Sequence, residues 1–329
     1  MLDLNSVLKN DSSPHSTVEA LKEYWDKALF HPWQEVRARP SKAIRGEFVR
    51  LGWHLAGSSE PIPEATILKI SEVIETLHLG SLIIDDIEDN SSERRGGPTL
   101  HQMYGVPLAL NLGNFLYFQA LSLISHLDVT AEYKSCAMNQ ITTTLRDAHL
   151  GQALDVSVAI DEVSRCKIPK LVETSLRLKS GALMKLSVHL GALLNPEFNN
   201  WEALHHFGES FGGCLQKFDD IGNFNLKAKS KKHLEDLILR RPTWIWSVFS
   251  VHASEVEWTH FLSAVKSLPC IKKLETFLQS TNLKKQAFEL ALDDLDKNLN
   301  HLKQSFSLQN SGPAFQLALS LTKKLSYAY

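Results

Sequence analysis

Two clusters of aspartates carry the side chains with the clearest chemical meaning. The first, Asp85-Asp86-Ile-Glu-Asp89, ends a run of apolar residues at helical spacing. Residues four apart lie on one face of a helix, so Asp85 and Asp89 should point together, with Asp86 beside them. Their like charges repel each other, and the negative end of the helix dipole increases the repulsion. The cluster therefore predicts a bound cation, and its carboxylate oxygens favour a hard one such as Mg²⁺.

Cationic side chains stand near this first cluster. Arg94 and Arg95 follow it, just before Gly96-Gly97-Pro98, and His78 precedes Asp85 by two helical turns on the same side. Arginine forms paired hydrogen bonds with phosphate oxygens, so carboxylates, a metal and two arginines together indicate a diphosphate site. Taken alone, the pattern is more typical of a solvated helix end with surface ion pairs. An EF-hand calcium loop is excluded because its glycine and its closing glutamate are missing.

A second acidic cluster ends another helical run of apolar residues. Asp219 and Asp220 follow Gln216 by about one turn, and Asn223 stands four residues after Asp219. Two acids alone mean little, but two such clusters on apolar helices make a shared metal site the better interpretation. Three basic residues flank this cluster in sequence: Lys179, Lys231 and Arg241. Each of them on its own is typical of a protein surface.

The composition is that of a globular protein. The chain has 329 residues, of which 43% are hydrophobic and 22% charged, with 35 basic and 37 acidic side chains. This balance excludes a disordered chain and argues against a nucleic-acid partner. The four cysteines are widely spaced and form no CxxC pair, which argues against a disulfide framework or a zinc site and favours a reducing, cytoplasmic location. We expect no secretory signal, because the N-terminus lacks a basic region followed by an apolar one.

Apolar residues recur at helical spacing along most of the chain, which predicts an all-α fold. The clearest helical segments are 65–88, 133–160, 170–194, 204–221 and 284–305, and the main breaks fall at 58–63, 90–98, 164–169, 195–200, 224–232 and 311–313. A flexible tail over residues 1–15 and a single domain over residues 16–329 are the simplest organisation. The most apolar stretch, Val106 to Ile124, contains polar residues, so we expect a buried core helix and no transmembrane segment.

These motifs resemble those of the trans-prenyltransferases, the isoprenyl or polyprenyl diphosphate synthases, with features of geranylgeranyl diphosphate synthases. The resemblance runs from about Lys42 to about Trp244, and the two acidic clusters match the two Asp-rich motifs of the family. Further matches are Lys42 and Arg45, Gly151-Gln152-Ala-Leu-Asp155 and Lys179-Ser180-Gly181. The resemblance implies a single large helical bundle with a central active-site cavity. It also implies condensation of isopentenyl diphosphate with an allylic diphosphate into a linear product.

The resemblance further implies a role for each matched residue. About three Mg²⁺ ions, with Mn²⁺ as a substitute, would be held by carboxylates: Asp85, Asp89, Asp155, Asp219 and Asp220. Isopentenyl diphosphate would contact Lys42, Arg45, His78 and Arg95, and the allylic diphosphate would contact Arg94, Lys179, Lys231 and Arg241. Catalysis would rest on Asp85, Asp86, Asp89, Arg94, Lys179, Ser180, Gln216 and Asp219, with Ser180 and Gln216 stabilising the allylic cation. Three positions depart from the family pattern: Ser41 replaces a glycine, Asn223 an acid and Arg241 a lysine.

The residues before the first acidic cluster suggest a product length. The growing chain would pass Leu77, Gly80 and Ser81, and a small residue at position 80 removes a floor that a bulky aromatic would provide. We therefore expect a product of about 20 carbons or longer, with farnesyl diphosphate as the shorter alternative, and a shortened product from a Gly80→Tyr variant. Phe115 and Phe118 are alternative floors, although ordinary core packing also accounts for such aromatics.

Two other functions fit parts of the sequence. A class I terpene cyclase also uses DDxxD, but its second motif needs Ser or Thr in place of Asn223 and Glu in place of Lys227. A regulatory subunit of a heteromeric prenyl synthase typically lacks one acidic motif, whereas both are present here. The family is usually homodimeric, and the apolar helix Leu108 to Ser125 is a candidate interface. Labelled isopentenyl diphosphate with allylic primers of several lengths would separate these functions.

Overall fold

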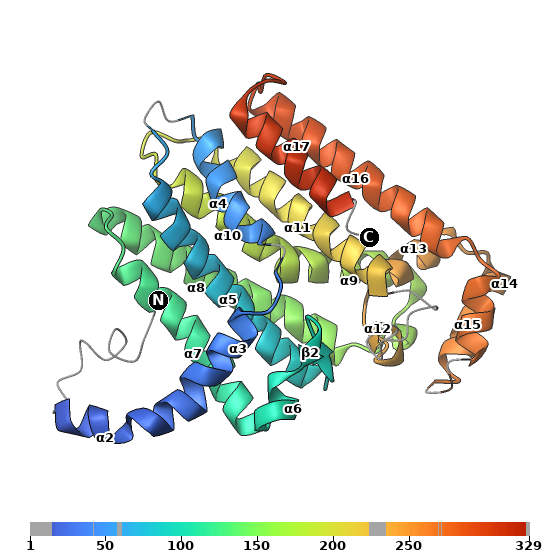
Figure 1. The fold of residues 1–329 in the computed structure, drawn as a ribbon. Coiled ribbons are helices and arrows are strands. Elements are labelled where there is room, and N and C mark those ends of the chain that lie inside the picture. Colours follow the sequence, from blue (N-terminus) through green and yellow to red (C-terminus); the bar gives the residue numbers. More distant parts are fainter. Residues whose placement is uncertain are drawn as a thin grey trace. The chain divides into compact units, whose positions relative to one another are not determined.

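The computed structural model describes residues 15–41, 43–57, 61–223, 235–268, 270 and 272–326. Helices make up nearly all of the described chain, and its only strands are the two-residue pair β1 (Glu93–Arg94) and β2 (Gly97–Pro98). The predicted all-α class is therefore confirmed. The chain divides into two compact units, unit 1 with Met1–Lys42 and Glu75–Ser122, and unit 2 with Ala43–Ile74 and Leu123–Tyr329 (Figure 1).

Unit 1 contains the first acidic cluster. Its elements are α2 (His15–Trp25), the π-helical turn η1 (Asp26–Phe30), α3 (His31–Arg37), most of α5 (Glu64–Glu88), the β1–β2 pair, α6 (Leu100–Tyr104) and most of α7 (Val106–Ser125). The core joins Phe30 and Trp33 to Ile83 of α5 and to Leu112 and Leu116 of α7. These apolar residues recur every three or four positions along α5 and α7, so each helix turns one face towards the core.

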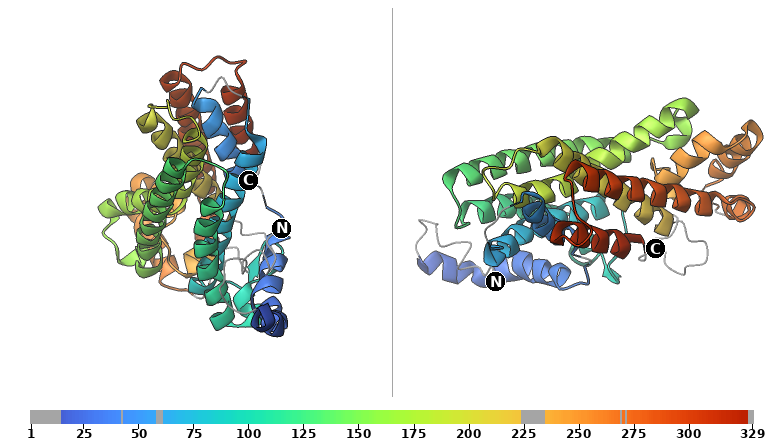
Figure 2. Two further views of the ribbon diagram at one scale, coloured as in Figure 1. Left: turned by 90° about the vertical axis from the view of Figure 1, so that its left-hand side faces the viewer. Right: turned by 90° about the horizontal axis from the view of Figure 1, so that it is seen from above.

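Unit 2 contains the second acidic cluster. Its elements are α4 (Ile44–Leu55), α8 (Ala131–Ser157), the 3₁₀ turns η2 (Ile160–Glu162) and η3 (Arg165–Lys167), α9 (Ile168–Leu176), the π-helical turn η4 (Arg177–Gly181), α10 (Ala182–Ala192), α11 (Trp201–Asn223), α12 (Glu235–Ile238), α13 (Trp244–His252), α14 (Glu255–Val265), α15 (Lys272–Gln279), α16 (Leu283–Ser305) and α17 (Pro313–Ser326). Helix α10 packs between α4 and α11, α11 packs on α16, and α16 lies beside α17 (Figure 2).

The predicted helices are confirmed in position, with two differences in detail. The helix predicted over 133–160 ends at Ser157, where the chain becomes extended. The segment 170–194 is not a plain helix, because the π-helical turn η4 separates α9 from α10. The predicted break at 90–98 holds the β1–β2 pair, and the break at 195–200 separates α10 from α11. The break at 224–232 and residues 1–14 of the predicted tail lie outside the described residues, and α2 already begins at His15.

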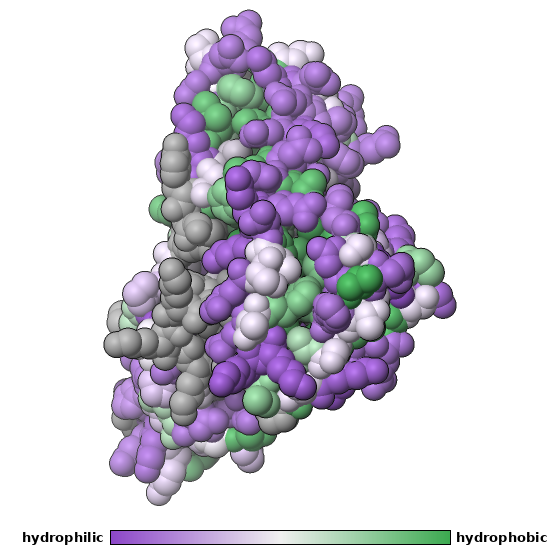
Figure 3. Space-filling view, turned by 90° about the vertical axis from the view of Figure 1, so that its right-hand side faces the viewer, coloured by the Kyte–Doolittle hydropathy of each residue, from purple (hydrophilic) through white to green (hydrophobic). Residues whose placement is uncertain are grey.

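Helix α7 is less buried than the sequence suggested. Ala109, Leu112 and Leu116 are fully buried, but Phe118 is 72% exposed and Leu110 is 43% exposed. Helix α7 is long and apolar enough to cross a membrane, as some core helices of soluble proteins also are. In its most apolar stretch of 18 residues, 39% is buried. Only one face of the expected core helix therefore lies in the core. On the face of the molecule drawn in Figure 3, hydrophobic residues form small groups among hydrophilic ones.

Two glycines allow α4 and α10 to approach each other closely in unit 2. A Cβ atom at Gly52 of α4 would overlap the carbonyl oxygen of Val188, and one at Gly191 of α10 would overlap the carbonyl oxygen of Val49. Backbone meets backbone at this crossing, so neither position has room for a side chain. This contact fixes α10, which continues directly from the π-helical turn η4.

We expect Gly191→Ala to lower the free energy of unfolding by at least about 3 kcal/mol, because α4 and α10 must separate to admit the methyl group. Gly213→Ala on α11 is the matched control, since nothing lies within 4 Å of its added Cβ. It should raise stability by about 0.5–1 kcal/mol through helix propensity. Urea unfolding followed by circular dichroism measures both. Equal stabilities for the two variants would contradict the close crossing.

A histidine pair joins α10 to α11, with His189 buried and His205 half-buried. The Nδ1 atom of His189 lies 2.8 Å from Nε2 of His205, and the ring of His189 packs on Trp201. Burial, together with the charges of His205 and Lys185, lowers the pKa of His189 to about 3. The pKa of His205 is also lowered, mainly by burial, although Glu209 opposes the shift. Both rings are therefore neutral in the folded protein at neutral pH.

The histidine pair predicts a loss of stability in weak acid. Between pH 6.5 and pH 3 the unfolded chain binds a proton at position 189 that the folded chain does not, so stability falls as the pH falls. At pH 5 the expected loss is about 2 kcal/mol for a fully buried histidine. Denaturant midpoints between pH 7.5 and pH 5 should therefore change less in His189→Asn than in the parent protein. The exposed His260→Asn control should keep the parent slope; an unchanged slope in His189→Asn would contradict this origin.

Candidate functional site

The first acidic cluster is neutralised by an arginine from the β1–β2 pair. The Arg94 Nε atom donates to Oδ1 of Asp86 over 2.7 Å, and its Nη2 atom lies 3.0 Å from Oδ2 of Asp85. Burial alone would lower the pKa of Arg94, but the charges and hydrogen bonds of Asp86 and Asp85 raise it above its ordinary value. Asp86 is itself buried. Arg94 is thus a permanent cation at the C-terminal end of α5, where the sequence predicted that one was needed.

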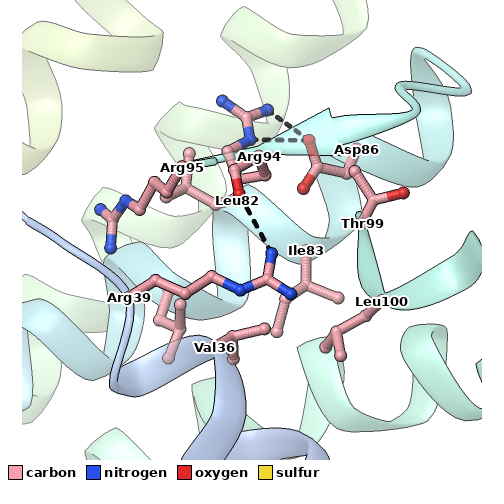
Figure 4. A pocket seen from close by; sticks show the side chains of 10 residues that line it. Val36, Arg39, Leu82, Ile83, Asp86, Arg94, Arg95, Thr99 and Leu100 are labelled. Carbon is pink, nitrogen blue, oxygen red and sulfur yellow. Dashed lines mark hydrogen bonds and ion pairs between the residues drawn. The ribbon is translucent and has the colours of Figure 1, made fainter. Parts of the chain in front are cut away.

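The turn between β1 and β2 directs Arg94 and Arg95 apart. Arg95 and Gly96 form the turn with φ values of 52° and 78°, both in the left-handed region. Arg94 reaches Asp86, whereas the Arg95 side chain leaves the turn in another direction (Figure 4). Burial lowers the pKa of Arg95, and the carboxylate of Glu75 opposes that shift. Arg95 makes no hydrogen bond or ion pair with another described residue, so its guanidinium is available to an anion.

The remaining residues predicted for isopentenyl diphosphate lie in different parts of the chain. His78 is buried on α5, in unit 1, and Ser81 donates its hydroxyl to the His78 carbonyl oxygen over 2.8 Å. Arg45 lies in the first turn of α4, in unit 2, after Ala43, which has a left-handed φ of 47°. Lys42 and, among the residues predicted for the allylic diphosphate, Lys231 lie outside the described residues.

The second acidic cluster ends α11 in a chain of hydrogen bonds. The Ser180 hydroxyl donates to Oε1 of Gln216 over 2.7 Å, and Nε2 of Gln216 donates to Oδ1 of Asp220 over 3.0 Å. The other oxygen of Asp220 accepts the backbone N–H of Trp244 over 2.7 Å. Burial raises the pKa of Asp220 well above its ordinary value, and Asp236 adds to the shift. Asp220 is therefore a buried group that orients Gln216, while Asp219 is the more accessible acid of the pair.

Asp155 is held at two points near the end of α8. Its side-chain oxygen Oδ2 lies 2.7 Å from Nζ of Lys179, which belongs to the π-helical turn η4. Its carbonyl oxygen accepts a hydrogen bond from Nη1 of Arg241 over 3.0 Å. The sequence placed Arg241 as a diphosphate ligand, yet here it is buried and supports the backbone of Asp155. The extra residue of a π-helical turn changes side-chain direction, a device common at functional sites.

One acidic residue of this region was missed by the sequence reasoning. Asp236 is the second residue of α12, and its Oδ2 atom accepts a hydrogen bond from Nδ2 of Asn223 over 3.1 Å. Its carbonyl oxygen also accepts the N–H of Arg241. The acidic pair Glu235-Asp236 was a visible signal, but nothing in its spacing linked it to the Asp219 cluster.

The expectation for Gly80 needs correction. A Cβ atom at Gly80 would lie 2.9 Å from the carbonyl oxygen of Gly113, 3.2 Å from Cβ of Leu116 and 3.3 Å from Cδ1 of Tyr117. The space beside Gly80 is therefore filled by α7 and is not open to a growing chain. A Gly80→Tyr variant would displace α7, so it cannot test product length as the sequence suggested. Leu77 is buried on the same helix, and Phe118, the proposed alternative floor, is largely exposed.

The acidic side chains suit a hard metal ion that is only partly coordinated by protein. Among the described residues, no group of three or more His, Cys, Asp or Glu side chains is placed to hold a metal ion. The donor chemistry is nevertheless all carboxylate, in pairs at the ends of α5 and α11 and singly at Asp155. Mg²⁺ keeps several water molecules and uses one or two carboxylates together with substrate phosphates. The residues present therefore fit Mg²⁺.

The polyprenyl synthetase family model matches residues 26–279. The chain belongs to this family. It is 31% identical over 236 residues to geranylgeranyl pyrophosphate synthase AN1592 of Hericium erinaceus, covering 64% of this chain and 67% of that protein. It is also 32% identical over 205 residues to preasperterpenoid A synthase PvPS of Talaromyces verruculosus, covering 62% of this chain but only 25% of that protein.

Solved structures of prenyl diphosphate synthases share the fold of this chain. Geranylgeranyl pyrophosphate synthetase from Pyrococcus horikoshii superposes with a TM-score of 0.75 at 23% identity, over 91% of this chain and 90% of that one. A decaprenyl diphosphate synthase from Rhodobacter capsulatus gives a TM-score of 0.73 at 16% identity, over 99% and 94% of the two chains. At these identities the similarity establishes the helical fold alone.

Removal of Arg94 should destabilise the protein, because Asp85 and Asp86 then lose the positive charge beside them. We expect Arg94→Met to lower the free energy of unfolding by about 2–3 kcal/mol in EDTA, because the buried Asp86 loses its countercharge. Millimolar Mg²⁺ should restore part of this loss by binding the same acids. Arg146→Met removes an exposed ion pair with Asp147 and should change stability by less than about 0.5 kcal/mol. If Arg94→Met unfolds at the same denaturant concentration as the parent protein, the role of Arg94 as countercharge is contradicted.

Proposed function

We propose that this polyprenyl synthetase is a trans-isoprenyl diphosphate synthase. It condenses isopentenyl diphosphate with an allylic diphosphate, head to tail, to give geranylgeranyl diphosphate or a longer linear product. The observation that carries the proposal is the pairing of acids with cations suited to phosphate: Arg94 on Asp85 and Asp86, and Lys179 on Asp155. Such pairs hold two phosphate-binding cations beside the acids.

Mg²⁺ is the proposed cofactor, with Mn²⁺ as a substitute. We propose that about three ions are held by Asp85, Asp89, Asp155 and Asp219, in keeping with the few carboxylates Mg²⁺ uses. When bound, they neutralise the charge that develops on the departing diphosphate. Asp220 is left out of this set, because both of its oxygens accept hydrogen bonds from the protein.

The side chains around the allylic diphosphate perform two tasks. Arg94 and Lys179 bind the diphosphate oxygens as their carboxylate partners take up metal, and Lys231 joins them. Ser180 faces the carbon that loses the diphosphate: its O–H points to Gln216, so its lone pairs are left to face a positive charge. Gln216 is kept in this orientation by Asp220. Arg241 holds the backbone at Asp155.

Isopentenyl diphosphate is bound in the proposal by Lys42, Arg45, His78 and Arg95. The substrate's double bond then attacks the allylic carbon, and the proton lost afterwards passes to the departing diphosphate, since no side chain is assigned as a general base. The cation must be kept from water, and the apolar residues of α5 and α7 supply such a surface beside the first cluster.

Tyr117 of α7 is the proposed floor of the product pocket. Its ring would be in contact with any side chain at position 80, one to two helical turns before Asp85. Burial raises the pKa of Tyr117, and the charges of Glu88 and Asp85 raise it further, so its hydroxyl lies near the first acidic cluster. The Tyr117 ring thus lies where the sequence led us to expect the side chain of residue 80 to limit the product length.

Product length should depend on Tyr117. We expect Tyr117→Ala to lengthen the main product by at least one isoprene unit, because the floor is removed, with kcat changed less than about tenfold. Tyr117→Phe keeps the ring and should keep the parent product. Mass spectrometry of dephosphorylated products from both variants measures this. An unchanged product from Tyr117→Ala would contradict the assignment.

We further propose that residues 16–329 act as one domain, in a cytoplasmic homodimer. Helices α5 and α7 each run without interruption from one unit into the other, which supports a single domain. The exposed apolar side chains of α7, Val106, Leu110 and Phe118, support an interface between copies. All four cysteines are free thiols, in agreement with a reducing compartment.

A direct assay tests the proposed function. Purified protein is incubated with Mg²⁺, labelled isopentenyl diphosphate and dimethylallyl, geranyl or farnesyl diphosphate. Linear diphosphate products support the proposal. Hydrocarbons formed from the allylic substrate alone identify a terpene cyclase, and no product in the absence of a partner protein identifies a regulatory subunit. Lys179→Met should lower kcat at least about a hundredfold, as expected for a lost charge contact to the leaving group. Lys170→Met, on the exposed side of α9, is the matched control.

A further inference from the structure

Arg39, just after α3, links that helix to the turn that carries Arg94 and Arg95. Its Nη1 atom donates to the carbonyl oxygen of Arg94 over 3.0 Å, and its Nη2 atom donates to Oε1 of Glu35 over 3.0 Å (Figure 4). Nη2 also lies 3.5 Å from the sulfur of Met103 on α6. The side chain is only 11% exposed. Both ends of the guanidinium are thus occupied by protein, which suits a structural link better than a substrate ligand.

The orientation of Arg39 is itself fixed. The hydroxyl of Tyr104, at the end of α6, donates to Oε2 of Glu35 over 2.9 Å, while Oε1 of Glu35 binds Arg39. Burial raises the pKa of Tyr104, and its hydrogen bond to Glu35 adds to the shift. The chain Tyr104–Glu35–Arg39 holds one end of the guanidinium and leaves the other directed at the Arg94 carbonyl group.

The turn that Arg39 contacts is strained. Arg95 has a left-handed φ of 52°, a conformation that is unfavourable for a non-glycine residue. Gly97 lies against the guanidinium so closely that a Cβ atom there would be 3.1 Å from Cζ of Arg39. Arg39 thus contacts both strands beside the turn, through its hydrogen bond to Arg94 on β1 and its contact with Gly97 on β2. These two contacts offset the strain and keep the two arginines pointing apart.

Arg94 and Arg95 depend on these contacts with Arg39 to different degrees. Arg94 is also fixed at its tip, where it forms ion pairs with Asp86 at 2.5 Å and Asp85 at 3.0 Å. Arg95 has no such ion pair among the described residues: the charges of Glu75 and Asp86 attract its guanidinium without forming one, and the positive charges of Arg94 and Arg39 repel it. The Arg95 side chain therefore depends on the shape of the turn for its direction more than the Arg94 side chain does.

We propose that Arg39 is a positioning residue for Arg95 and thereby for the diphosphate that Arg95 binds. In terms of the proposed function, on which this inference rests, that ligand is isopentenyl diphosphate. Loss of the Arg39 guanidinium lets the turn relax, so Arg95 spends less time in the binding direction while Arg94 stays on its aspartates. The effect therefore falls on one substrate and spares the other.

The test compares Arg39→Gln and Arg39→Lys with the exposed Arg37→Gln, which removes the same charge two residues earlier. Amide hydrogen exchange of residues 93–97 reports on the turn directly and needs no activity. Losing one buried hydrogen bond of about 1–1.5 kcal/mol should speed exchange about five- to tenfold in Arg39→Gln. In steady-state assays, KM for isopentenyl diphosphate should rise about tenfold, with KM for the allylic substrate and kcat within about twofold. Arg39→Lys should recover little, since an ammonium cannot span both acceptors.

Each outcome decides a separate point. Equal rises in both KM values, or a fall in kcat alone, would show a general loss of structure and overturn the positioning role. Exchange at the parent rate in Arg39→Gln would overturn it as well. If the parent protein forms no product with any primer, the proposed function fails, yet the exchange experiment and calorimetric titration with Mg²⁺ and pyrophosphate still test Arg39. In that case, unchanged pyrophosphate affinity in Arg39→Gln would overturn the inference.

Discussion

Carboxylates at the C-terminal end of a helix need a cation beside them, and this constraint organises the acidic residues of both units. Asp85 and Asp86 lie in the last turn of α5, and Asp155 lies in the last turn of α8. In each place the negative end of the helix dipole adds to the charge of the acids. A cation from another element compensates: Arg94 from β1 in one case and Lys179 from η4 in the other. The short strand pair and the π-helical turn place these cations where a regular helix would not.

The same pairing explains how the site can hold together without its ligands and still accept them. A metal ion that binds the acids takes over the charge compensation that Arg94 and Lys179 provide. The two cations then have unsatisfied charge, which diphosphate oxygens neutralise through hydrogen bonds of the same kind. Partners are exchanged without a stage in which a buried charge stands alone, a stage that would cost several kcal/mol. In the proposed reaction, the metal and the diphosphate therefore favour each other's binding.

The sequence was sufficient for the helices and for the residue types of the site, because both follow from local patterns. Helices α5, α8, α11 and α16 could be predicted from apolar spacing alone. Arg39, the π-helical turn η4 and the environment of Gly80 could not, since each depends on a contact between distant segments. Arg39 is one of 35 basic residues in the chain, and nothing near it marks the carbonyl group of Arg94 as its partner. Gly80 looked like an opening because no local signal shows that α7 fills the space beside it.

Asn223 stands where the family pattern has an acid, and the charges around it explain why an amide fits there better than a carboxylate. The described end of α11 already gathers Asp219 and Asp220, and Asp236 lies close enough to raise the pKa of Asp220. A further carboxylate at position 223 would face Asp236, and two like charges at hydrogen-bond distance repel each other. The asparagine amide instead donates to Asp236 over 3.1 Å and so turns a repulsion into an attraction. An acid from α12 therefore lies beside the end of α11, and the residue that departs from the pattern holds it there.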